Sequence, residues 1–171
     1  MKKETAKDTE NLLLHIMQKR KWVSITELMK LSYLIDYTLS TKNLSPITGF
    51  SYIRYFYGPF DRDIYRIIED LIRRKEVVED TEFSDTGREY IVYGLANKAQ
   101  DMYDYLSDID AKRSHLVQQI LEKLSTCNSK LLYHLHTTFY HIPPNTKPEH
   151  SIEVFVVFDS KQVASLCAIC I

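Results

Sequence analysis

The chain has 171 residues with 22 basic and 23 acidic side chains, so its net charge near -1 lacks the positive field typical of nucleic-acid-binding proteins. Apolar residues make up 44% of it, which is too many for a disordered protein and suits one domain with a single core. The apolar runs end well short of the ~20 residues that a membrane span needs. We therefore expect a soluble globular protein with no membrane partner.

The cysteines point to a reducing compartment. Cys127, Cys167 and Cys170 cannot all pair within one chain, and no apolar run behind Met1 resembles a signal peptide. We expect a cytoplasmic protein. The C-x-x-C spacing of Cys167 and Cys170 is interpreted as apolar terminal sequence, because no second pair completes a zinc or redox site.

Two helices are predicted first. Leucine, isoleucine and methionine at helical spacing predict an amphipathic helix over residues 8–21. Ser24 then lies three positions before Glu27, the spacing of a capping box, and predicts that a second helix begins there. This second helix carries apolar residues on more than one face, so we expect it to be the central buried helix.

An aromatic stretch follows over residues 50–60, with six aromatic residues in eleven positions. We predict one strand that ends at Gly58 and Pro59, because proline cannot donate a hydrogen bond to a sheet. Strand alternation places Tyr52 on one face and Tyr55 on the other, so aromatic side chains occupy both faces. These rings belong either to the edge of the core or to a binding surface.

A helix, a hairpin and further helices complete the pattern. Asp61 or Asp63 can cap a helix whose apolar stripe runs from Ile64 to Ile72. Two strands over residues 75–80 and 90–93 follow it around a polar turn, and helix followed by hairpin is the order of a winged helix. Three more helices are predicted, with apolar stripes over residues 99–106 and 116–124 and a last one ending before Pro143 and Pro144.

The predicted fold class is mainly α, within α+β. It is a compact helical domain over residues 1–142 with a winged-helix-like helix plus β-hairpin and a short aromatic strand. Residues 143–171 form a C-terminal extension that we expect to pack on the same domain.

One histidine cluster is the only candidate metal site. His134, His136 and His141 have H-x-H-x4-H spacing, but in a helix His134 and His136 would point about 200° apart. We therefore assign no metal. A small metal-dependent enzyme built on these histidines is kept as a further hypothesis. The sequence contains neither a glycine-rich phosphate loop nor a G-x-S-x-G elbow. We expect no catalytic residues and no cofactor.

The charges of the helix and hairpin argue against nucleic acid as a partner. Residues 61–75 carry five basic and four acidic side chains, and residues 76–89 carry six acidic side chains against Arg88 alone. A DNA duplex would repel a hairpin with a net charge of -5. The acidic hairpin is either a solvated edge protected by charge or a binding patch for a basic protein.

Four segments together resemble a known family. K-L-S-Y-L-I-D-Y at 30–37, I-T-G at 47–49, R-Y-F-Y-G-P-F at 54–60 and L-I-R-R-K-E-V-V at 71–78 resemble, in order and spacing, the SocA-type antitoxin domain, also called Panacea. The resemblance covers roughly residues 8–141. Many members have a His-x-Glu-x-Pro-Trp-like segment where this chain has L-H-T-T-F-Y at 135–140, and the tail has no recognised counterpart.

The resemblance implies a mostly helical, non-catalytic protein, encoded in phage, prophage or defence loci, that binds and neutralises a cognate protein toxin. It assigns no contact residues. Our candidates come from the aromatic strand and the acidic hairpin: Arg54, Tyr55, Tyr57, Phe60, Arg62, Glu79, Asp80, Glu82 and Asp85. The alternative is a winged-helix transcriptional regulator.

Overall fold

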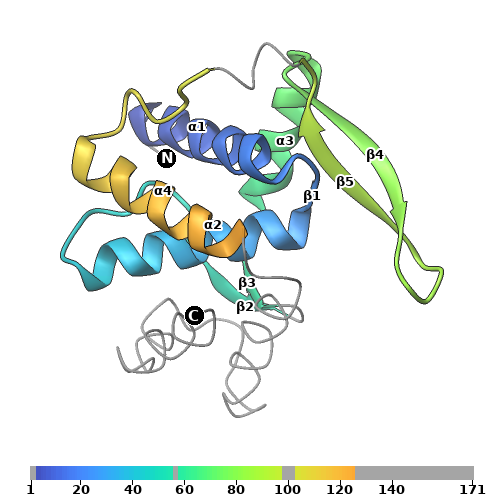
Figure 1. Ribbon diagram of the computed structural model, residues 1–171, viewed down its shortest axis with the longest axis horizontal. Coiled ribbons are helices and arrows are strands. Elements are labelled where there is room, and N and C mark those ends of the chain that lie inside the picture. Colours follow the sequence, from blue (N-terminus) through green and yellow to red (C-terminus); the bar gives the residue numbers. More distant parts are fainter. Residues whose placement is uncertain (1–2, 56–57, 98–102, 126–171) are drawn as a thin grey trace.

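The computed structural model describes residues 3–55, 58–97 and 103–125, and within them the chain has an α+β fold. Helix α1 (Lys3–Arg20), helix α2 (Ile25–Thr41) and helix α4 (Ala111–Ser125) form a helical body (Figure 1). The predicted last helix, the histidine cluster and the residues of the C-terminal extension lie outside the described ranges.

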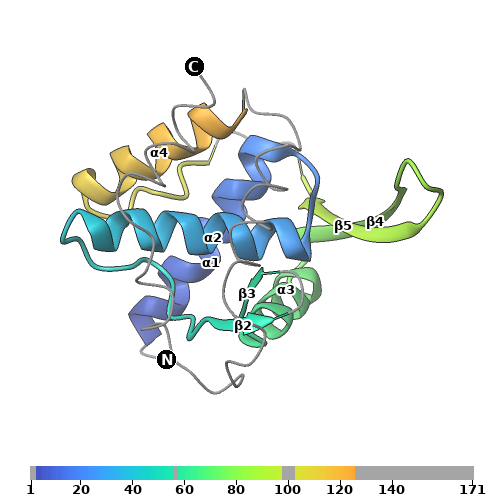
Figure 2. The same ribbon diagram turned by 90° about the horizontal axis from the view of Figure 1, so that it is seen from below.

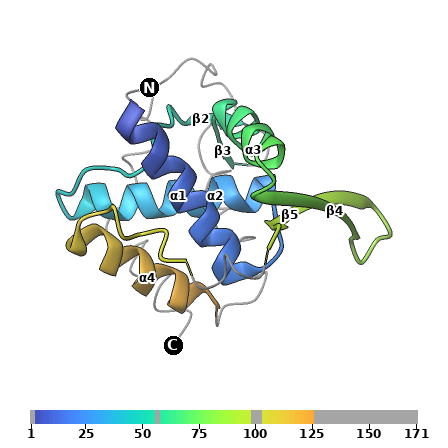
Figure 3. The ribbon, with the colours of Figure 1, turned by 90° about the horizontal axis from the view of Figure 1, so that it is seen from above.

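The predicted central helix is confirmed. Ser24 caps α2, since its hydroxyl accepts a hydrogen bond from the Glu27 backbone N–H at 3.2 Å. Figure 3 shows α1 lying across α2, with α4 beside them. Burial on more than one face follows, because α2 contacts a helix on each of two sides.

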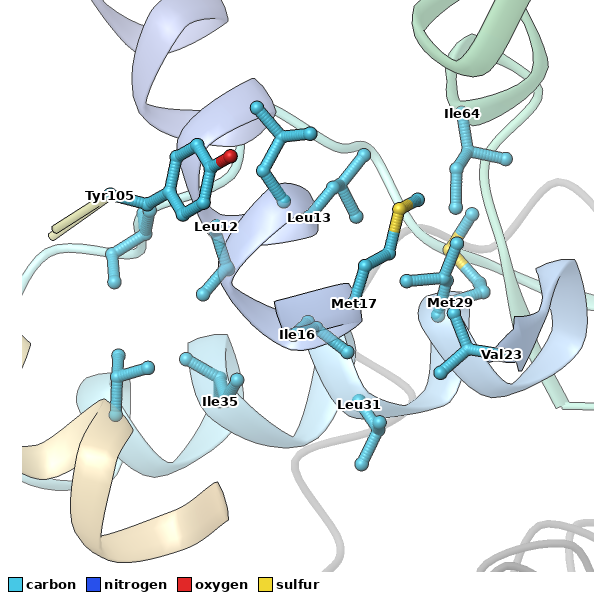
Figure 4. Close-up of a cluster of buried hydrophobic side chains, with 14 of the residues drawn as sticks. Leu12, Leu13, Ile16, Met17, Val23, Met29, Leu31, Ile35, Ile64 and Tyr105 are labelled. Carbon is cyan, nitrogen blue, oxygen red and sulfur yellow. The ribbon is translucent and has the colours of Figure 1, made fainter. Parts of the chain in front are cut away.

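Apolar side chains from α1 and α2 meet in the core. Leu12 and Ile16 of α1 lie over Leu31 and Ile35 of α2, and Ile64 approaches from the next helix along the chain (Figure 4). All five are almost completely buried. Burying an aliphatic side chain of this size stabilises a fold by about 1.5–3 kcal/mol, so this contact is a major source of stability.

The helix-then-hairpin order is present. Helix α3 (Asp63–Arg73) buries its predicted stripe and leads into strand β4 (Val77–Phe83), which pairs antiparallel with strand β5 (Glu89–Leu95). Both strands are longer than predicted, because cross-strand pairing continues through Phe83 and Glu89 at one end and Leu95 at the other. Strand β1 (Val23–Ser24) pairs with β5, and the sheet order is β1-β5-β4. Beyond its base the hairpin projects away from the helices (Figures 1 and 2).

The single aromatic strand is a wrong prediction. The stretch forms a small antiparallel hairpin of strand β2 (Ile53–Tyr55) and strand β3 (Gly58–Phe60), so Gly58 and Pro59 start a strand where we expected an end. Gly58 has a φ of 119°, a conformation that favours glycine. Pro59 is tolerated because each strand of a two-stranded sheet keeps one unpaired edge. Tyr57 lies outside the described residues.

The helix predicted over residues 99–106 is not formed in its described part. Residues 103–110 make turns and bends, although Tyr105 and Leu106 are buried as the apolar pattern suggested. Asp104 accepts a hydrogen bond from the Leu106 N–H at 3.0 Å, and Asp110 accepts from the Arg113 N–H at 3.1 Å. Aspartates that bond nearby backbone groups in this way compete with a helix, and here Asp110 caps α4.

Among the described residues, no helix combines the length and the apolar character required to cross a membrane.

Candidate protein-binding surface

A buried carboxylate connects the central helix to the aromatic hairpin. Asp36 of α2 is 5% exposed and accepts four hydrogen bonds. Its Oδ1 accepts from the backbone N–H groups of Ile47 at 2.8 Å and Thr48 at 3.2 Å. Its Oδ2 accepts from the Thr48 hydroxyl and, at 3.0 Å, from the Tyr52 hydroxyl. The carboxylate therefore holds the segment that leads into β2.

Burial raises the pKa of Asp36, while the hydrogen bonds from Thr48 and Ile47 oppose that rise. Burial also raises the pKa of Tyr52 well above its ordinary value, so this hydroxyl stays protonated and can donate. Four donors match the four acceptor positions of a carboxylate. We interpret Asp36 as a positioning group. Asp36 lies in one of the segments that carry the family resemblance, but no local pattern indicated its role.

Three aromatic side chains line the outside of the β2–β3 hairpin and α3. Tyr55 and Phe60 stack with ring centroids 4.9 Å apart and an interplanar angle of 29°. The ring centroids of Phe60 and Tyr65 are 6.1 Å apart. Tyr55 is 51% exposed and Tyr65 is 45% exposed. We call Tyr55, Phe60 and Tyr65 the aromatic row. Tyr65 was not among the predicted contact residues, although its position off the apolar stripe of α3 indicated an exposed ring.

The aromatic row approaches the larger hairpin at Tyr93 of β5. Burial raises the pKa of Tyr93, and the neighbouring Glu79, Tyr65 and Glu69 raise it further. Glu79 lies directly opposite Tyr93 in the strand register, whereas Tyr65 and Glu69 belong to α3. The base of the hairpin and α3 therefore share one surface that carries aromatic and acidic groups.

Strand alternation divides the projecting hairpin into two sides. The side that faces α3 carries Glu79 with Tyr93, and farther out Ile91 and Phe83. We call it the α3 side. Its apolar tip residues are well exposed, since Phe83 is 64% and Ile91 51% accessible to solvent.

The opposite side is named the Trp22 side. A Cβ added to Gly94 would lie 2.8 Å from the Lys21 carbonyl oxygen and 2.9 Å from the Trp22 ring, so the indole packs directly on this glycine. Val78 is paired with Gly94 and shares this side. Tyr90 lies farther out, and Val78 and Tyr90 are each 40% exposed.

The structure separates the predicted acidic contacts. Glu79 lies on the α3 side, Asp80 and Glu82 lie on the Trp22 side, and Asp85 lies in the turn between the strands. Asp80 accepts a hydrogen bond from the Thr81 N–H at 2.8 Å, and Glu82 accepts one from the Tyr90 hydroxyl at 2.8 Å. Thus Glu79 lies on the side of the hairpin that faces α3, while Asp80 and Glu82 lie on the opposite side.

The two predicted arginines lie at the β2–β3 hairpin and the start of α3. Arg54 is paired with Pro59 in the β2–β3 register, and Arg62 is the residue immediately before α3.

The other arginines of this region form ion pairs. Arg66 pairs with Asp63 at 3.6 Å and Arg73 with Asp70 at 2.7 Å. Arg74 pairs with Glu10 at 2.7 Å and with Glu76 at 2.9 Å. These contacts reduce the positive potential that α3 could offer to a phosphate backbone.

Exposed tyrosines such as Tyr55 and Tyr65 are of a residue type enriched at protein interfaces. The family model described as antitoxin SocA-like, Panacea domain, matches residues 28–140, which is more than half of the chain. The chain therefore belongs to the SocA-like antitoxin family, and the resemblance found in the sequence is confirmed. Searches of curated proteins and of solved structures returned no match.

Proposed function

We propose that this protein is a cytoplasmic antitoxin that binds its cognate protein toxin directly and masks it, within a toxin–antitoxin or phage-associated system. Family membership supports an antitoxin role in general. The observation that carries the direct-binding mechanism is the aromatic row, whose two tyrosines are exposed and which lies beside the base of an acidic hairpin.

The two parts of this surface suit different tasks. Exposed tyrosines supply large contact areas at low entropic cost and are frequent anchors of protein interfaces. Carboxylates on a projecting hairpin attract a basic partner over a distance and speed its association. Toxins that bind nucleotides or RNA through basic sites would be complementary to such a surface.

Co-expression with the product of the adjacent gene tests the proposal. The neighbour alone should stop growth, and this chain should restore it while forming a complex that co-elutes on gel filtration. A neighbour that is harmless alone, or that remains toxic beside this chain, would contradict the antitoxin function.

A winged-helix regulator remains the alternative, because α3 is followed by the β4–β5 hairpin and β1 adds a third strand. The ion-paired arginines and the acidic hairpin oppose it. A mobility-shift assay with the promoter DNA of its own operon separates the two functions. We expect no sequence-selective shift, whereas selective binding that falls steeply with salt would favour the regulator.

A further inference from the structure

We propose that the partner toxin docks on the α3 side of the hairpin and leaves the Trp22 side free. This inference rests on the proposed antitoxin function and narrows it to one surface. It also assigns the partner a chemistry: an exposed apolar side chain surrounded by basic residues.

Aromatic and aliphatic side chains follow one another along the α3 side. The aromatic row brings Tyr65 close to Tyr93, and the exposed Ile91 and Phe83 extend the same side toward the hairpin tip. Figure 2 shows α3 beside the base of the hairpin, with β2 and β3 next to α3. An interface centred on Tyr65 would therefore find aromatic or aliphatic contacts in both directions.

Acidic side chains flank this apolar path. Glu69 and Glu79 lie close enough to Tyr93 to raise its pKa. Glu89 is the residue opposite Phe83 near the tip. Apolar contacts with carboxylates beside them match an apolar centre with a basic rim, which is the usual arrangement of polar and apolar groups in interfaces.

The Trp22 side offers less to such a partner. Trp22 packs on Gly94 at the base and is 41% exposed, whereas Ile91 and Phe83 on the α3 side are 51% and 64% exposed. The carboxylates of Asp80 and Glu82 accept hydrogen bonds from the hairpin itself. Binding a basic partner there would compete with contacts that this chain already makes.

Adjacent residues on one strand provide a matched test, because they point to opposite sides. Ile91→Ser removes an exposed apolar side chain from the α3 side, and Tyr90→Ser does so on the Trp22 side. We expect Ile91→Ser to raise the Kd for the purified toxin about 30-fold or more, as for a central anchor. Tyr90→Ser should change it by less than about threefold.

A second pair tests the charge. Glu79→Lys and Asp80→Lys make the same change in net charge at neighbouring positions on opposite sides. At low salt Glu79→Lys should raise the Kd about tenfold, and at least about threefold more than Asp80→Lys. The difference should shrink at high salt, since exposed charges are screened.

The Kd of each of the four variants is measured by titration calorimetry. The full chain is titrated with toxin whose own activity has been disabled, and melting curves check that each variant is folded. The docking proposal would be overturned by equal losses of affinity on both sides, by a larger loss on the Trp22 side, or by no loss in any variant. In each of these cases binding by the wild type would still uphold the antitoxin function. A wild-type chain that fails to bind would refute both.

Discussion

Among single residues, Asp36 is a buried carboxylate that accepts four hydrogen bonds. Its carboxylate satisfies two backbone N–H groups and two hydroxyls that lie in the following loop and at the start of the aromatic hairpin. Unsatisfied buried donors each cost about 1–3 kcal/mol. The residue therefore links α2 to the segment that leads into β2.

Asp36→Ala is expected to lower the free energy of unfolding by at least about 3 kcal/mol, because four donors lose their acceptor. Asp36→Asn should cost less than half as much, since the amide keeps the shape and the Thr48 and Tyr52 hydroxyls can rotate to accept from it. Urea denaturation measures both. An alanine variant as stable as the asparagine variant would show that the carboxylate is not the anchor.

His15 should make stability depend on pH. The ring is 3% exposed, and burial, assisted by Lys19, lowers its pKa to about 4 from an ordinary 6.5. The unfolded chain then takes up the proton first as pH falls. The stability that the neutral His15 ring contributes is fully present above about pH 6.5. It is lost progressively as the pH falls to about 4, by up to about 3 kcal/mol.

Comparison with His15→Leu isolates this effect, because leucine fills similar space and does not titrate. Denaturation curves between pH 4 and 7 should slope less steeply for His15→Leu than for the wild type. The same slope in both proteins would mean that other groups control the pH dependence.

At the scale of elements, the attachment of the β4–β5 hairpin depends on Gly94. The close approach of Lys21 and Trp22 leaves no room for a Cβ, and one of the two contacts is a backbone oxygen that cannot simply rotate away. The base of the hairpin is therefore held against β1 and the end of α1.

Gly94→Ala is expected to destabilise the fold by about 1–3 kcal/mol, the usual cost of overpacking. It should also increase the exposure of Trp22, which is the only tryptophan in the chain and so reports directly by fluorescence. Thr86→Ala, in the exposed turn of the same hairpin, serves as the control. An unchanged melting temperature and emission maximum for Gly94→Ala would contradict the packing argument.

At the scale of the whole molecule, the distribution of charge matters more than its sum. Although the net charge of the chain is -1, residues 76–89 of the projecting hairpin carry six acidic side chains against Arg88 alone. Because the hairpin stands clear of the helices (Figure 1), its field would reach the proposed partner before the aromatic row does.

Reversing Glu79, Asp80, Glu82 and Asp85 to Lys raises the net charge by eight, from -1 to +7. The association rate with the toxin should fall by about tenfold or more at low salt, and the effect should weaken at high salt. Surface plasmon resonance at two ionic strengths measures it. An unchanged association rate at low salt would show that the charges of the hairpin do not contribute to binding.

Local patterns predicted most of the elements. Apolar spacing identified α1, α2, α3 and α4, and the Ser24–Glu27 spacing located the start of α2, because helix periodicity and capping involve residues within one or two turns. The helix predicted over 99–106 failed in its described part for the converse reason. Its apolar residues are buried, but aspartates nearby hold the backbone in turns.

The family, the helical core and the acidic character of the hairpin could be read from the residues alone, since these depend on residue type and short-range order. Tertiary structure decided that Pro59 enters a second strand, that Asp36 bonds a loop eleven residues away, and that Glu79 and Asp80 belong to opposite sides. These placements depend on strand register and on contacts between residues far apart in the sequence. Which strand pairs with which, and against which helix, sets the side on which each residue lies, and no local pattern encodes that choice.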